Sequence, residues 1–323
     1  MSRRSEIARL IVGTVRAAFL SAALFVSAAL VPVVGAIAAL FAPTPILLFA
    51  VGTRAPRLRA AAVILVAAIA ATLLGGWVTG LSYAISFGLA AAVMCDMLDR
   101  RKPFETIVLV TAAATLAAGV IAAYLMAGSV DQLAASVRAA LATGMAHGRD
   151  LYKVLGMETG LGRRAESAAL DTTMRLTPAL VALCAGFGAL LNLGLFSRLG
   201  GQGRLGYSLF GDLARWSAPE WLIWLLLATG FGMFVPVPAL TVAALDAFVC
   251  VAAVYFCQGL AIMAFYFRAF SVPPWVRGLI YFVIIVQPVL AALVCAAGIF
   301  DLWVDFRRLR PPRREAGNFG DFF

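Results

Sequence analysis

Charged residues and histidine are scarce in this sequence, and their scarcity excludes several kinds of protein. Only 13% of the residues are Asp, Glu, Lys or Arg, about half the share found in soluble domains. The single histidine, His147, leaves a zinc or haem site almost without ligands. The five cysteines form no CxxC pair and are spread along apolar runs, which argues against a disulfide framework. We therefore expect neither a metal nor a cofactor.

Apolar residues take up most of the chain. They make up 63% of its 323 residues, and the mean hydropathy is +0.96. Several runs reach the roughly 20 residues that a membrane-spanning helix needs. The runs are continuous, whereas the strands of an outer-membrane barrel alternate. The sequence predicts an all-α, polytopic helical membrane protein, with one membrane domain over residues 1–306 and a basic, proline-containing tail over 307–323.

Nine apolar segments are candidate spans. The second is broken by Pro43 and Pro45, which predicts a short helix or two half-helices because proline ends or kinks a helix. The candidates cover residues 17–31, 32–52, 60–79, 84–98, 104–126, 176–196, 221–235, 240–267 and 279–303.

The distribution of arginine and lysine predicts how these spans are oriented. The net charge is +10, and the arginines fall in short loops between apolar runs. Membrane proteins keep such basic loops in the cytoplasm. We therefore expect a bacterial inner-membrane protein with a cytoplasmic N-terminus, and no nucleic-acid partner. With nine spans, every loop obeys the rule except the basic tail. With eight spans the tail lies in the cytoplasm. This count requires that the broken second segment does not cross the membrane, or that a later stretch is re-entrant. Eight and nine spans both remain open.

The segment 128–175 is too polar to span a membrane. Ser129 and Gln132 have the spacing of a capping box, and the apolar residues that follow fall on one helical face. This pattern predicts an amphipathic helix lying at the membrane surface.

Five polar side chains within or beside the apolar runs are candidates for ligand binding, because a polar group in hydrocarbon is costly without a partner. The alternative is hydrogen bonding between helices, worth about 0.6–2 kcal/mol. The acid among them lies only about 9 Å into its run, at 1.5 Å per residue, where an aqueous rim is within reach. The five residues are Asn192, Asp246, Tyr255, Gln258 and Gln287.

Four acids near the ends of apolar runs form a second set of candidates. Asp96 and Asp99 share a helical face, so they either hold a magnesium ion beside a lipid phosphate or are solvated acids at a helix end. Asp301 and Asp305 follow Gly298 in a pattern that superficially resembles half of the acidic motif of CDP-alcohol phosphotransferases. The other half of that motif has no match, so we assign no catalytic residue.

The C-terminal sequence carries a family resemblance. The stretches VYFCQGLAI (254–262) and IVQPVLAALVCAAGIFDLWVDFRRL (285–309), with APEWLIWLLL (218–227), resemble the YybS-like family of bacterial membrane proteins, a domain of unknown function. The N-terminal half also resembles the substrate-binding subunits of energy-coupling-factor vitamin transporters at the level of fold. The shared features are a first span, a short proline-flanked second helix, a basic loop and a third span.

These observations favour a non-enzymatic membrane protein that binds or moves an unidentified small molecule in a cavity walled by the last spans. Its expected partners are the bilayer and possible partner membrane subunits. Because the sequence has no ATP-binding motif, coupling to ATP would need another subunit. One alternative is a scaffold or assembly factor that acts through protein partners. Another is a lipid-headgroup enzyme that uses Asp96 and Asp99, or Asp301 and Asp305.

Overall fold

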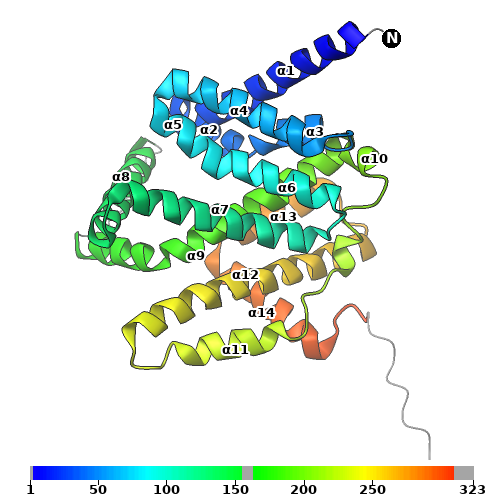
Figure 1. The fold of residues 1–323 in the computed structure, drawn as a ribbon. Coiled ribbons are helices and arrows are strands. Elements are labelled where there is room, and N and C mark those ends of the chain that lie inside the picture. The colour runs from blue at the N-terminus through cyan, green and yellow to red at the C-terminus, as the bar shows by residue number, and fades with distance from the viewer. Residues whose placement is uncertain (1–2, 155–162, 309–323) are drawn as a thin grey trace, which may run out of the picture. The chain divides into compact units, whose positions relative to one another are not determined.

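The computed structural model describes residues 3–154 and 163–308, and their regular secondary structure is entirely helical (Figure 1). This confirms the predicted all-α class. The contacts divide the chain into two compact units, Met1–Leu209 (unit 1) and Phe210–Phe323 (unit 2).

Unit 1 holds ten α-helices and two π-helical segments within the described residues, and unit 2 holds four α-helices and one 3-10 helix. The elements of unit 1 are α1 (Arg3–Leu30), α2 (Pro32–Ala39), α3 (Pro43–Ala50), α4 (Pro56–Gly75), α5 (Trp77–Tyr83), η1 (Ala84–Gly88), α6 (Leu89–Asp99), α7 (Phe104–Ala127), α8 (Val130–Val154), α9 (Arg163–Phe196), η2 (Ser197–Gly201) and α10 (Gln202–Leu205). Those of unit 2 are η3 (Leu213–Arg215), α11 (Leu222–Gly232), α12 (Pro238–Ala269), α13 (Pro274–Val286) and α14 (Pro288–Val304).

Six of the described helices are long and apolar enough to cross a membrane, fewer than the eight or nine spans predicted. Prolines divide two of the predicted spans, and a third is the 11-residue helix α11. Proline favours a helix start because it lacks the N–H that a first turn leaves unpaired. The six helices are Ile7–Leu30, Pro56–Gly75, Trp77–Asp99, Phe104–Ala127, Arg164–Gly200 and Pro238–Ala269.

The two short helices α2 and α3 together lead the chain back along α1. As the chain advances through α2 and α3, it meets earlier and earlier residues of α1, so this segment runs antiparallel to α1. The contacts pair Ser27 with Gly35, Ser21 with Ala42, and Gly13 with Phe49. The proline-broken segment therefore returns the chain to the end of unit 1 from which α1 comes.

Helix α8 lies across the ends of α7 and α9 (Figure 1). Exposed ion pairs join it to the first part of α9, Arg138 to Asp171 at 2.6 Å and Arg149 to Glu166 at 2.9 Å. Gln132 donates its backbone N–H to Ser129 Oγ, as the predicted cap requires. The predicted amphipathic helix is confirmed.

The last predicted span, 279–303, is a bent pair of helices. The chain turns by 104° between α13 and α14. Contacts between α12 and α14 advance in the same direction along both helices, so these two helices run parallel. They pair Ala252 with Cys295, Gln258 with Asp301, and Tyr266 with Phe306.

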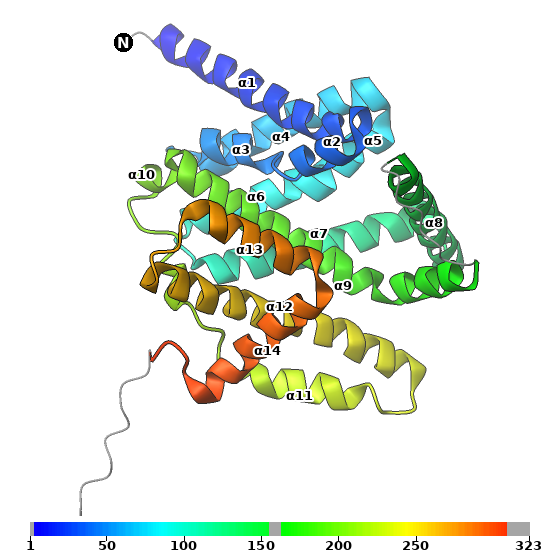
Figure 2. The same cartoon turned by 180° about the vertical axis from the view of Figure 1, so that it is seen from behind.

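Helix α13 begins where α12 ends, with the rings of Phe267 and Tyr281 5.5 Å apart. The hydroxyl of Tyr266 then meets the carbonyl oxygen of Phe306 at 2.8 Å, at that same end of α12. Figure 2 shows α13 leading away from the end of α12 and α14 returning toward it. This path is the one expected of a re-entrant hairpin, which is one of the two routes to eight spans that the charge pattern left open.

We predict that the C-terminus and the α12–α13 turn lie on the same side of the membrane. An epitope inserted after Phe270 and one fused to the C-terminus should be labelled from the same side in oriented vesicles. An epitope inserted after Val235, in the α11–α12 turn, should be labelled from the other side. Labelling of the C-terminal epitope together with the one after Val235 would show that α13 and α14 form one continuous crossing.

Candidate functional site

Basic residues gather at one end of unit 1, which we call the basic end. It consists of the loop 51–55, the turn 100–103 and the segment 197–207. Arg57 Nε and Asp96 Oδ1, 2.5 Å apart, join the start of α4 to α6. The hydroxyl of Tyr207 donates to the carbonyl oxygen of Leu98 at 3.2 Å, which joins the chain after α10 to α6. The three segments therefore lie side by side in the fold.

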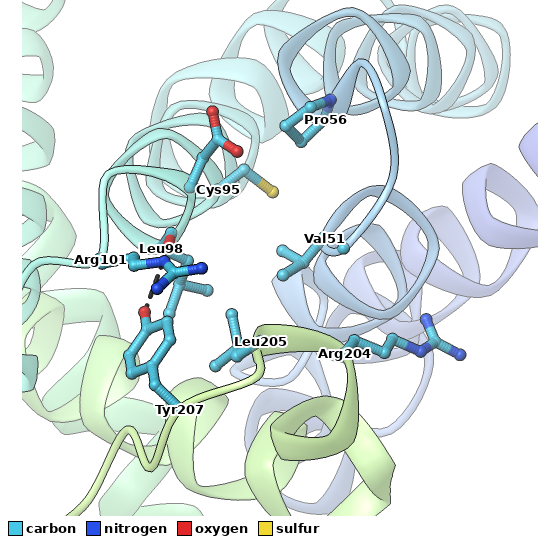
Figure 3. Close-up of a pocket in the computed structure, with 10 residues that line it drawn as sticks. Val51, Pro56, Cys95, Leu98, Arg101, Arg204, Leu205 and Tyr207 are labelled. Carbon is cyan, nitrogen blue, oxygen red and sulfur yellow. Dashed lines mark hydrogen bonds between the residues drawn. The ribbon is translucent and has the colours of Figure 1, made fainter.

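A cavity of about 130 Å³ opens at the basic end, and we call it the arginine pocket (Figure 3). Apolar residues form its buried wall, but most of its accessible surface is polar, and its rim carries charges of both signs. The wall is formed by Val51, Pro56, Cys95, Leu98 and Leu205, and the rim by Gly52, Asp99, Arg101, Arg204 and Tyr207.

Arg101 occupies a backbone conformation that normally belongs to glycine. Its φ is +53°, directly after the end of α6. The N–H groups of Arg101 and Lys102 close the helix by donating to Leu98 and Met97, both at 3.1 Å. Glycine is usual in this position of a Schellman motif, and a residue with a Cβ is strained there by about 1–2 kcal/mol. An arginine held here at such a cost is a candidate for function.

The guanidinium of Arg101 lies over the ring of Tyr207, 5.9 Å from its centroid (Figure 3). Burial raises the pKa of the Tyr207 phenol, and the charge of Arg101 acts in the opposite direction. The phenol therefore stays protonated near neutral pH and keeps its hydrogen bond to Leu98. Tyr207 fixes Arg101 at the rim of the pocket.

Arg204 lines the other side of the pocket. The would-be Cβ of Gly52, whose φ is +77°, lies 2.8 Å from the Cβ of Arg204, so only glycine allows this approach. The stem of Arg204 faces the cavity, while its guanidinium is directed away from it (Figure 3). One cation, Arg101, and one anion, Asp99, remain at the rim.

The two acids predicted as a pair at the end of the fourth span have different surroundings. Both oxygens of Asp96 are engaged, by Arg57 at 2.5 Å and by Arg100 at 2.8 Å, whereas Asp99 lines the pocket. In the described ranges, no group of three or more His, Cys, Asp or Glu side chains is arranged to hold a metal ion. Of the two carboxylates, therefore, only that of Asp99 lines the pocket, while that of Asp96 is paired with arginines.

Residues 19–302 match a family described as predicted membrane proteins, DUF2232. The chain belongs to the DUF2232 family. No curated protein and no solved structure matches it. The match covers both units of this DUF2232 protein, so family membership extends from α1 to α14.

Unit 2 of this DUF2232 protein contains a buried ion pair that the sequence analysis did not find. Arg307 Nη2 lies 2.7 Å from Asp301 Oδ2, and the two side chains are 1% and 5% exposed. Gln258 donates to the same carboxylate oxygen at 3.0 Å, and the N–H of Phe306 donates to the other at 3.0 Å. The sequence assigned Arg307 to the tail, but the structure buries it. The rest of the predicted tail, from residue 309, lies outside the described residues.

This ion pair satisfies backbone groups outside the α-helices. Arg307 donates to the carbonyl oxygens of Ala214 and Trp216 at 2.9 and 2.8 Å. The N–H of Ala218 donates to Gln258 Oε1 at 3.1 Å. A buried backbone group without a partner costs about as much as a lost hydrogen bond, so a buried irregular segment needs partners from the surrounding protein. Gln258, Asp301 and Arg307 supply them here, and we call these three residues the polar clamp.

Close packing of two glycines brings α14 onto α12 beside the clamp. A Cβ at Gly259 would lie 2.0 Å from the carbonyl oxygen of Val294, and one at Gly298 would lie 2.0 Å from that of Tyr255. Small residues let membrane helices approach this closely. Gly298 belongs to the sequence pattern that resembles a catalytic motif, but here it allows the close contact between α12 and α14.

Asn192 has a comparable structural role in unit 1. Its Nδ2 donates to the carbonyl oxygens of Leu40 and Gly188, both at 2.7 Å, and its Oδ1 accepts from Thr44 Oγ1 at 2.7 Å. Leu40 lies in the break between α2 and α3, where a carbonyl has lost its helical donor. Asn192 replaces that donor.

The other predicted residues have different surroundings. Tyr255 is fully buried, and its hydroxyl has no hydrogen-bond partner within the described residues. Gln287 is exposed at the bend between α13 and α14. Asp246 is half-buried on α12, and Asp305 ends α14 with a φ of +47°. Ligand binding by these residues stays a prediction.

We predict that Arg307→Met destabilises the protein by about 3–5 kcal/mol, because the Asp301 charge stays buried without its partner. Thermal unfolding in detergent measures the loss. The exposed neighbour Arg308 supplies the control, since Arg308→Met should change stability by less than about 0.5 kcal/mol.

The double variant Asp301→Asn/Arg307→Met should be more stable than Arg307→Met alone, because no unpaired charge remains. Equal unfolding temperatures for Arg307→Met and Arg308→Met would refute the structural role of the clamp.

Proposed function

We propose that this protein binds a small molecule in the arginine pocket and acts as a transporter-like, non-enzymatic component of the bacterial inner membrane. The observation that carries the proposal is the pocket itself, a cavity of about 130 Å³ whose accessible surface is mainly polar and whose rim carries charges of both signs. Convergent polar groups in a cavity fix the orientation of a ligand and give specificity.

The charge distribution supports a cytoplasmic location for the pocket. Basic residues of α4, of the turn after α6 and of the segment after α9 share the basic end, whereas α8 covers the opposite ends of α7 and α9 (Figure 1). Loops rich in Arg and Lys stay in the cytoplasm. We therefore place the basic end, and the N-terminus with it, on the cytoplasmic side.

The resemblance of the N-terminal half to transporter subunits supports a transport-related role. The features shared with substrate-binding subunits of energy-coupling-factor transporters correspond here to α1, to α2 and α3, to the loop 51–55 and to α4. The C-terminal likeness to the YybS-like family covers α11, α12 and α14. A binding subunit of this kind would work with partner membrane subunits that supply energy.

The substitution Arg101→Gly separates ligand binding from folding. Glycine relieves the left-handed strain but loses the contact with Tyr207, so we expect stability within about 1 kcal/mol of the wild type. Native mass spectrometry of the detergent-purified protein should show a bound small molecule on the wild type and at least tenfold less of it on Arg101→Gly.

Ser271→Gly is the matched control. Ser271 has a φ of +52° after the end of α12, the same helix-closing position that Arg101 has after α6. This variant should keep the bound molecule at the wild-type level. The proposal fails if the wild type retains no small molecule, or if Arg101→Gly and Ser271→Gly retain equal amounts.

A further inference from the structure

The charges at the rim of the arginine pocket limit the kind of ligand that fits. Arg101 and Asp99 both line the cavity, and no ion pair joins them within the described part of the chain. A purely anionic ligand would meet the Asp99 carboxylate, and a purely cationic one would meet the Arg101 guanidinium. A ligand with one charge of each sign can pair with both groups.

The size and position of the pocket point to a headgroup. A cavity of about 130 Å³ is well below the roughly 300–1,000 Å³ of pockets that enclose drug-sized ligands. The pocket opens where α4 begins and where α6 and α9 end, beside the basic loops. Lipid headgroups meet a membrane protein at this level. The hydrocarbon tails of a lipid would remain outside.

The chemistry of the two rim residues indicates which part of the ligand each residue would bind. A guanidinium offers a planar set of N–H donors that matches phosphate oxygens. A carboxylate accepts hydrogen bonds from a primary ammonium group. The strained backbone of Arg101 and its contact with Tyr207 keep the guanidinium at the rim before any ligand arrives, which reduces the ordering needed on binding.

We infer that the arginine pocket binds a phosphate–ammonium zwitterion of the phosphoethanolamine type, with Arg101 on the phosphate and Asp99 on the ammonium group. This inference rests on the proposed function and names the ligand class of the same pocket. Two sources carry this chemistry, the headgroup of phosphatidylethanolamine and a soluble phosphoethanolamine ester.

Lipid titrations followed by native mass spectrometry test the inference on the full-length protein. The wild type should retain phosphatidylethanolamine about tenfold better than phosphatidylglycerol, which has the phosphate but no ammonium group, because one charge-assisted hydrogen bond is lost. Asp99→Asn should remove this preference. Asp171→Asn, which removes a carboxylate from an exposed ion pair next to α8, should preserve it.

Competition with glycerophosphoethanolamine distinguishes the sources. Displacement of the bound lipid at equal concentration identifies the soluble ester as the ligand, and retention identifies the lipid. Both outcomes support the zwitterion.

Equal retention of the two lipids by the wild type, or an unchanged preference in Asp99→Asn, overturns the inference. In that case the proposed function still stands if Arg101→Gly loses a bound molecule that Ser271→Gly retains. If the wild type binds nothing in either experiment, both fail.

Discussion

A break in a membrane helix frees backbone carbonyl and N–H groups that lipid cannot satisfy, and this constraint governs most of the structure. Each such group costs several kcal/mol if it stays unpaired. At the break between α2 and α3, Ser21 donates to Ala42 and Asn192 donates to Leu40. The irregular segment before α11 lies outside the candidate spans, and its buried backbone groups are paired by the polar clamp. Ser21, Asn192 and the polar clamp therefore supply partners where the helices are interrupted.

This constraint also explains the buried charge pair. Two carbonyls, Ala214 and Trp216, need donors at one point, and a guanidinium has enough N–H groups to serve both and still reach Asp301. Its charge then needs a carboxylate, because an isolated ion is too costly to bury. The return of α14 along α12 brings that carboxylate and the arginine to the segment they satisfy. The return of α14 along α12 thus also provides the hydrogen-bond partners of the irregular backbone.

Local patterns in the sequence were sufficient to predict the helical class, the proline breaks, the amphipathic helix and the basic loops. They did not reveal which polar residues are partners. Asn192 meets Thr44 across 148 positions, and Gln258 meets Asp301 across 43, so neither pairing follows from helical periodicity. Arg307 looked like part of a solvated tail because its neighbours are charged. The pocket was also missed, since Arg101, Arg204 and Tyr207 come from two separate segments. The one local signal was an arginine in place of the glycine that usually closes a helix such as α6.

The location of the arginine pocket follows from the same physics. Within the spans, Asn192 and Gln258 are already engaged by the protein, so a ligand would have to replace contacts that the fold needs. At the basic end, Asp99 and Arg101 can face water when no ligand is present, and leaving them open carries little cost. Recognition groups that need no partner from the fold are therefore found more readily near the ends of the helices. A ligand is better sought at the rim formed by α6 and the segment after α9 than in the middle of the last spans, where the sequence concentrates its amides.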